Sequence, residues 1–155
     1  MSEIIDWLYK YGESHQNKTN KVIHCISVPI IFFTLLGILS QVQVSILENI
    51  VPYEISNLAC IIILFGMFFY LQLSFVMFVG VGIFTILHGH GIYFLNHSGY
   101  DLEINTGLFL LSWIGQFIGH KIEGIKPSFF EDLKFLLNGP AWLIALIFIK
   151  LGIRY

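Results

Sequence analysis

Six histidines stand in a chain whose other residues are mostly apolar. Three of them, His15, His24 and His120, lie where apolar stretches meet polar segments that carry lysine. A neutral imidazole offers a lone pair to iron, zinc or copper, and few other side chains in this sequence can do so. The sequence therefore predicts a metal centre at a membrane edge, and an intramembrane metalloenzyme is the first hypothesis for its function.

Two polar side chains accompany His120 at helical spacing. Gln116, His120 and Glu123 are spaced i, i+4 and i+7, so they share one face if the helix continues past the membrane edge. Glu123 could orient the imidazole of His120 through its second nitrogen, or bind the metal itself. Gln116 could equally bond a neighbouring helix, which leaves its role open.

The position of His15 relative to His24 requires a turn in the chain. In one unbroken helix these two residues would face away from each other. The polar segment 16–20 between them must therefore turn the chain if both are to bind the same ion.

The other three histidines occupy different positions. His88 and His90 lie inside an apolar stretch, where packing or a water-lined cavity is the favoured interpretation. His97 lies in a polar loop, and a simple count of membrane crossings puts it on the side opposite to the first three. The sequence leaves open whether any of them completes the metal site.

The composition indicates the class of protein that holds these side chains. Apolar residues make up 56% of the chain and charged residues 12%, whereas soluble proteins have roughly a quarter of charged residues. The formal net charge of -2 offers no basic surface for nucleic acid. Cys25 and Cys60 lie in or beside apolar runs and are expected to be free thiols. We expect a multi-pass, all-α integral membrane protein that forms a single domain over residues 1–155.

Hydropathy predicts a helical bundle of four to five spans, preceded by an interfacial helix within residues 1–20. The apolar run from 57 to 95 is too long for one helix across a core of about 30 Å, so a hairpin is expected between Tyr70 and Ser74. Asn20 is expected to cap the first span. Gly115 and Gly119 have the small-xxx-small spacing that lets a neighbouring helix approach closely. The expected spans are 22–40, 57–70, 72–95, 106–120 and 141–153.

Beyond the fourth span, Ser128 and Glu131 form a capping-box pattern that opens an amphipathic segment. Gly139 and Pro140 are expected to break that segment before the last span.

Basic residues cluster before the first span and after the fourth, and the loops between carry none. They are Lys10, Lys18, Lys21, Lys121, Lys126 and Lys134. Both regions are therefore expected in the cytoplasm, which brings the three edge histidines to one side of the membrane. No apolar signal-peptide core precedes the first span, so that span is expected to direct insertion. The sequence favours a bacterial inner membrane, with the endoplasmic reticulum membrane expected for a eukaryotic source.

Two segments carry a more specific pattern. The first runs from Tyr11 to Pro29 and contains His15, Asn20 and His24. The second is Trp113-Ile114-Gly115-Gln116-Phe117-Ile118-Gly119-His120, followed by Glu123, Lys126-Pro127 and Asp132-Leu133. Together they resemble the Mpo1-like family over most of the chain. Asn96-His97 resembles the family's Asp-His position, with Asn96 in place of the acid; Ile122 stands where an aromatic-Glu pair is common, and His88 and His90 have no counterpart.

The resemblance implies an iron(II)-dependent dioxygenase that converts 2-hydroxy fatty acids into fatty acids one carbon shorter and releases carbon dioxide. It implies His15, His24 and His120 as Fe(2+) ligands and His97 as a fourth ligand carried over from the family. Glu123, Asn20 and Gln116 would support these ligands. The positive charges of Lys18, Lys121 and Lys126 could attract the carboxylate of the substrate.

The implied chemistry fits the residue types. A 2-hydroxy carboxylate can chelate iron through two oxygens, while histidines hold the metal and leave positions open for O₂. The reaction uses the full oxidising capacity of one O₂, so it needs no external reductant, and no flavin or nicotinamide motif is seen. The acyl tail would lie among the apolar spans, beside membrane lipid.

Three alternatives remain. A membrane di-iron hydroxylase would need clusters of the H-x-x-H type, which are missing from the sequence. A histidine-lined metal or proton transporter would need more spans or an inverted repeat, although a homo-oligomer could supply more helices. In a structural membrane protein the histidines would be incidental. Iron content separates the enzyme from the structural protein, and oxygen uptake separates it from the transporter.

Overall fold

The computed structural model describes residues 16–96, 99–124 and 138–153, and within these ranges the chain is helical, with no strand. An isolated antiparallel bridge joins Gln43 to Asn57. The all-α prediction is confirmed. The helices are α2 (Lys18–Ser40), α3 (Ser45–Glu48), the 3-10 helix η1 (Tyr53–Ile55), α4 (Leu58–Leu73), α5 (Phe75–Asn96), α6 (Asp101–Glu123) and α8 (Asn138–Leu151).

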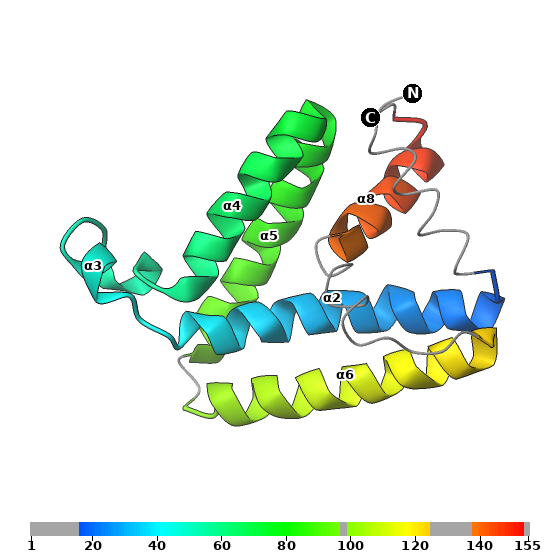
Figure 1. Ribbon diagram of the computed structural model, residues 1–155, viewed down its shortest axis with the longest axis horizontal. Helices are drawn as coiled ribbons and strands as arrows, with labels where there is room; N and C mark the ends of the chain where they lie inside the picture. Colours follow the sequence, from blue (N-terminus) through cyan, green and yellow to red (C-terminus); the bar gives the residue numbers. More distant parts are fainter. Residues whose placement is uncertain (1–15, 97–98, 125–137, 154–155) are drawn as a thin grey trace.

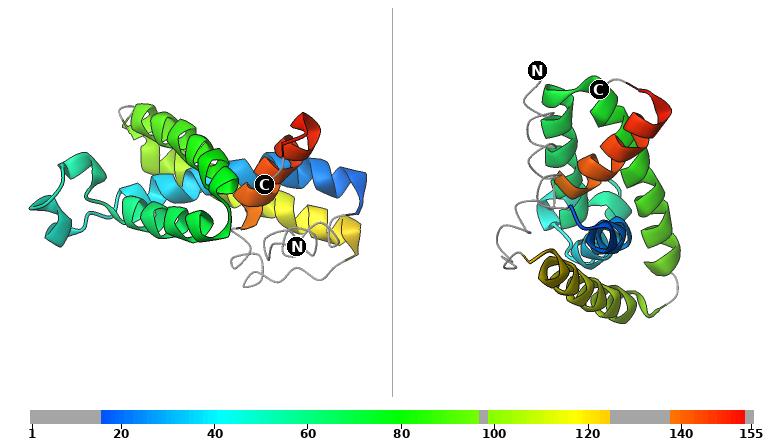
Figure 2. Two further views of the ribbon diagram at one scale, coloured as in Figure 1. Left: turned by 90° about the horizontal axis from the view of Figure 1, so that it is seen from above. Right: turned by 90° about the vertical axis from the view of Figure 1, so that its right-hand side faces the viewer.

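Helices α2 and α6 form a close antiparallel pair (Figure 1), and the end-on view in Figure 2 also places them side by side. Glycines allow this approach. A Cβ atom on Gly119 would collide with the Asn20 side chain, and one on Gly37 would collide with the Asn105 amide. Gly115 faces Ser27, whose Oγ would lie 3.1 Å from an added Cβ. The predicted close approach at Gly115 and Gly119 is therefore confirmed, with α2 as the neighbouring helix.

The interface of this pair is lined with buried polar side chains, which we call the polar seam. On α2 its members are separated by four, three and seven residues, a spacing that keeps one side of a helix on a partner. Large apolar residues of α6, such as Ile114 and Phe117, are exposed on the outside instead. Polar groups inside and apolar groups outside suit an apolar surrounding. The seam consists of Asn20, His24, Ser27, Thr34, Asn105, Ser112, Gln116 and His120.

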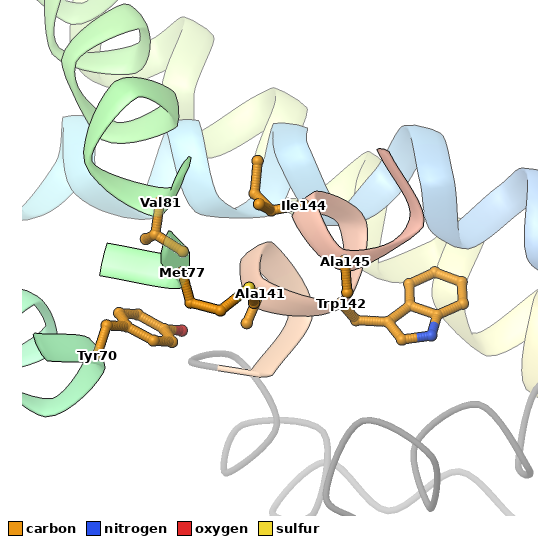
Figure 3. Close-up of a cluster of buried hydrophobic side chains, with 7 residues drawn as sticks. All are labelled: Tyr70, Met77, Val81, Ala141, Trp142, Ile144 and Ala145. Atoms are coloured by element: carbon orange, nitrogen blue, oxygen red, sulfur yellow. The ribbon is translucent and has the colours of Figure 1, made fainter. Parts of the chain in front are cut away.

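Helices α4 and α5 form a second antiparallel pair, joined at Ser74. The break lies within the hairpin expected between Tyr70 and Ser74. In Figure 1 this hairpin is steeply inclined to the α2–α6 pair. Helix α8 packs on it through an apolar cluster in which Met77 of α5 is fully buried against α8 (Figure 3). The cluster comprises Tyr70, Met77, Val81, Ala141, Trp142, Ile144 and Ala145.

Two of the described helices are long and apolar enough to cross a membrane, Lys18–Ser40 and Phe75–Leu95. This suggests a membrane protein. The apolar segments Leu58–Gln72 and Gly139–Leu151 are shorter. Of the four to five expected spans, two are thus supported by length and apolar composition. The α4–α5 hairpin is steeply inclined to α2 and α6, whereas the helices of a simple bundle would run roughly parallel.

Several expected boundaries change. The N-cap of α2 is Asn17, whose side chain accepts hydrogen bonds from the backbone nitrogens of Thr19 and Asn20, so Asn20 lies inside the helix. Asn17 takes this place because its backbone is extended, as a cap requires. Gly139 and Pro140 belong to the first turn of α8, where proline costs no hydrogen bond. The expected interfacial helix, up to residue 15, and the capping box at Ser128 lie outside the described residues.

Candidate metal centre

His24 and His120 come together at one end of the α2–α6 pair. His24 lies in the N-terminal part of α2 and His120 in the last turn of α6, and the antiparallel arrangement places both at the same end. Their rings meet edge to face, with centroids 5.2 Å apart and an interplanar angle of 83°. Only 2% of His24 and 6% of His120 is exposed. Two imidazoles are thus held against each other away from solvent.

This geometry is compatible with a shared metal ion. Two imidazoles that bind one ion through nitrogens at about 2.1 Å have ring centres roughly 5–6 Å apart, which includes the observed separation. Imidazole is also a common donor for iron. Among residues 16–96, 99–124 and 138–153, no group of three His, Cys, Asp or Glu side chains could hold a metal. Within these ranges the centre is a pair, and a further protein ligand would come from the rest of the chain.

The carboxylate of Glu123, at the end of α6, binds the start of α2. Its Oε1 accepts hydrogen bonds from the backbone nitrogens of Gln16 at 2.7 Å and Asn17 at 3.1 Å, and Oε2 lies 3.1 Å from the same Asn17 nitrogen. Oε2 also accepts from Nδ2 of Asn20 at 2.8 Å. A carboxylate at a helix N-terminus is favoured by the helix dipole. These bonds connect the two helix ends that carry His24 and His120. The expected role of Glu123 in orienting His120 stays a prediction.

The two other predicted supporting residues, Asn20 and Gln116, lie one turn before His24 and His120 respectively. Asn20 is completely buried, between Glu123 and the close approach at Gly119. Gln116 is also buried in the polar seam. Helix α6 continues to Glu123, as the expected shared face of Gln116, His120 and Glu123 requires.

His15, His97 and Lys126 lie outside the described residues. The residue after His15 is Gln16, whose backbone nitrogen binds Glu123 at the end of the pair that holds His24 and His120.

The described segments before and after His97 lie far from the histidine pair. Asn96 ends α5 and Asp101 begins α6, at the opposite end of α6 from His120 (Figure 1). At 1.5 Å per residue, Asp101 and His120 are about 28 Å apart along the helix.

The predicted lysines that are described, Lys18 and Lys121, are exposed at the histidine end of the pair. Lys18 is the first residue of α2, and Lys121 follows His120. They are placed where positive charge could attract an anion toward this end.

The histidines of α5 have other surroundings. Nδ1 of His88 donates a hydrogen bond of 2.7 Å to the carbonyl of Phe84. The ring centroids of His88 and Phe84 are 4.0 Å apart. The rings of Phe32 and Phe33 are also within 6.0 Å of it. The packing interpretation is therefore confirmed for His88. His90 is exposed, with its ring 6.2 Å from that of Phe94.

The sequence analysis did not identify the rest of the polar seam. Ser27 and Thr34 on α2, and Asn105 and Ser112 on α6, continue it away from the histidines. A detectable signal was present, because Asn20, His24, Ser27 and Thr34 recur at helical spacing in an otherwise apolar stretch.

Comparison with known proteins gives two matches. The family described as 2-hydroxy-palmitic acid dioxygenase Mpo1-like matches residues 1–151. The chain is also 29% identical over 150 residues to the 2-hydroxy-palmitic acid dioxygenase MPO1 of Saccharomyces cerevisiae, an alignment that covers 92% of this chain and 78% of that protein. No solved structure matches the chain.

Proposed function

The chain belongs to the Mpo1-like family, and on that premise we propose that it is an iron(II)-dependent dioxygenase of lipid metabolism. It converts a 2-hydroxy fatty acid into the fatty acid one carbon shorter, with release of carbon dioxide. The family and its yeast member, which is named for 2-hydroxy-palmitic acid, support the substrate class and the reaction type. The observation that carries the iron assignment is the buried pair of imidazoles, His24 and His120.

The reaction balances with one molecule of oxygen. R-CH(OH)-COOH and O₂ give R-COOH, CO₂ and H₂O, so no external reductant is consumed. When bound, iron(II) supplies oxygen activation and a chelation site for the substrate's hydroxyl and carboxylate oxygens. His24 and His120 would hold it, with His15 as the third ligand; His97 is kept as a candidate fourth ligand to be tested by substitution.

The residues of the chain have separate tasks in this proposal. Lys18 and Lys121, together with Lys126, attract the substrate carboxylate to the histidine end of the pair. Glu123 and Asn20 keep the ends of α2 and α6 together, so the two imidazoles stay at a fixed separation. The acyl chain lies along the apolar outer faces of the pair, in contact with membrane lipid.

Metal analysis tests the ligand assignment. We expect His24→Ala and His120→Ala each to reduce the iron content of the purified protein at least about tenfold, because each removes one of only a few donors. Oxygen uptake with 2-hydroxyhexadecanoate should be lost in parallel. His90→Ala is the matched control, since His90 is exposed on another helix, and it should keep both properties.

Two results would contradict the proposal. Full iron occupancy in both His24→Ala and His120→Ala would end the ligand assignment. Iron that is bound by the wild type without consumption of oxygen or release of carbon dioxide would end the dioxygenase assignment. The same assay of His15→Ala and His97→Ala identifies the further ligands.

The second candidate is a membrane metal or proton transporter, and the polar seam favours it. Buried polar side chains continue from His24 and His120 to Thr34 and Asn105 at the other end of the pair. A transporter would move protons or metal ions across liposomes without 2-hydroxy acid, whereas the proposed enzyme would not.

A further inference from the structure

A cavity of about 490 Å³ lies at the end of α2 that is far from the histidine pair. It is half open and is lined by residues of the C-terminal parts of α2 and α5, the starts of α4 and α6, and the η1 segment. Ser40, at its wall, is about 24 Å from His24 along α2. Its volume lies within the usual range of small-molecule sites, roughly 300–1,000 Å³.

The cavity has an apolar floor and a polar, acidic mouth. Leu36 and Ile92 are buried in the floor. Tyr53, Glu54 and Tyr93 are exposed and Asp101 is half-buried; we call these four lining residues the mouth of the cavity. Among the described lining residues there is no Lys or Arg. The described lining of the cavity therefore contains two carboxylates and no Lys or Arg side chain.

Other polar residues of the cavity are used by the fold itself. Asn57 caps α4 through a hydrogen bond from the Cys60 nitrogen, and its Nδ2 donates to the carbonyl of Glu54. Gln43 accepts a hydrogen bond from Ser56. These bonds hold the segment that carries Tyr53 and Glu54 against the start of α4, so the mouth is built on a supported backbone.

A second, small apolar pocket of about 30 Å³ lies beside the floor, between α2, α4 and α5. Leu36 and Ile63 line both pockets, and Phe32, Met67 and Pro140 are among the other residues that line the small one. A mouth that carries carboxylates beside a floor of apolar side chains matches a molecule with a polar head and a short hydrocarbon tail.

We propose that this cavity binds an amphiphile with an ammonium headgroup. Glu54 and Asp101 would attract the cation, and Tyr53 and Tyr93, which also line the cavity, could add cation–π contact. The first carbons of the tail lie on Leu36 and Ile63. A fatty acid carboxylate is disfavoured here by the same charges, so the site is separate from the proposed catalytic centre.

Binding of hexyltrimethylammonium to the full chain in a neutral maltoside detergent tests the proposal by calorimetry. We expect saturable binding to the wild type and at least about tenfold weaker binding to Glu54→Gln combined with Asp101→Asn. Hexanoate, which has a tail of similar length and the opposite charge, should not bind. Glu48→Gln is the matched control, because it removes an exposed carboxylate nearby that does not line the cavity.

The single variant Glu54→Gln, which leaves the helix-terminal Asp101 in place, guards against a folding defect and should weaken binding in the same direction. Hexanoate binding as strong as that of the cation, or unchanged cation binding in both variants, would overturn the proposal. Iron content is the independent readout: it should stay at the wild-type value in both variants, so failure here is distinguishable from failure of the dioxygenase proposal.

Lipid nanodiscs identify the source of the headgroup. If phosphatidylcholine nanodiscs suppress hexyltrimethylammonium binding and phosphatidylglycerol nanodiscs do not, the proposal is supported and the occupant is a membrane lipid. Equal saturable binding in both supports a free ammonium amphiphile as the occupant.

Discussion

At the level of single residues, Glu123 is the side chain whose contacts say most about the candidate centre. One carboxylate accepts hydrogen bonds from Gln16, Asn17 and Asn20, all at the start of α2. Hydrogen bonds to an ionised group are shorter and stronger than those between neutral groups. The carboxylate also compensates the backbone N–H groups that a helix start leaves without partners. Glu123 therefore connects the two ends that hold His24 and His120.

We predict that Glu123→Gln lowers the free energy of unfolding by about 1–3 kcal/mol. The amide removes the charge and turns one of its two acceptor positions into a donor that faces the donors of Gln16, Asn17 and Asn20. Thermal unfolding in detergent measures the effect, and iron titration should show weaker binding because the imidazole pair is less well held. Glu48→Gln, an exposed carboxylate of α3, is the control. Equal melting temperatures for the two variants would show that these bonds add no stability.

At the level of the helices, the close approach of α2 and α6 determines the site. Gly119 lies against Asn20, whose side chain is completely buried and bonded to Glu123. Because Asn20 is held in this way, it has little room to move away from an added methyl group. The polar seam beside it can stay buried only while the two helices remain close.

We therefore predict that Gly119→Ala destabilises the protein by about 1–3 kcal/mol, the usual cost of inserting an atom into a packed interior. Gly107→Ala is the control on the same helix, because a Cβ there would meet no atom within 4 Å. Alanine favours a helix over glycine by about 1 kcal/mol, so the control should be neutral or stabilising. Circular dichroism melts of both variants give the comparison. A Gly119→Ala protein as stable as Gly107→Ala would contradict the described approach.

At the level of the whole molecule, the antiparallel pair places Lys18 and Lys121 at one end and the cavity with Glu54 at the other. Helix α2 has 23 residues and is about 34 Å long, slightly more than the bilayer core of about 30 Å. A pair that crosses the membrane would expose its two ends on opposite sides.

Cysteine labelling tests this topology. In a background with Cys25 and Cys60 replaced by serine, we predict that Lys18→Cys and Lys121→Cys react with an impermeant maleimide from the same side. Glu54→Cys should react from the opposite side. Lys18→Cys and Lys121→Cys on different sides would contradict the antiparallel pair. Labelling of all three from one side would show that the pair lies along the membrane surface.

The class of fold and part of the candidate site could be predicted from residue types and their spacing. Helical content, the break at Ser74 and the close-packing glycines follow from local composition and spacing, which act over a few residues. The expectation that His24 and His120 meet at one end came from the placement of lysines and from the family resemblance, and the structure brings these residues together. Their role as iron ligands remains a prediction.

Tertiary structure alone decided the partners of Glu123, the inclination of the α4–α5 hairpin and the cavity at the far end of α2. Glu123 and Gln16 are separated by 107 positions in the sequence, so no local pattern could indicate their contact. The cavity likewise depends on how the ends of separate helices come together. Such features arise from side-chain packing between distant segments, which has many arrangements compatible with the same hydropathy pattern.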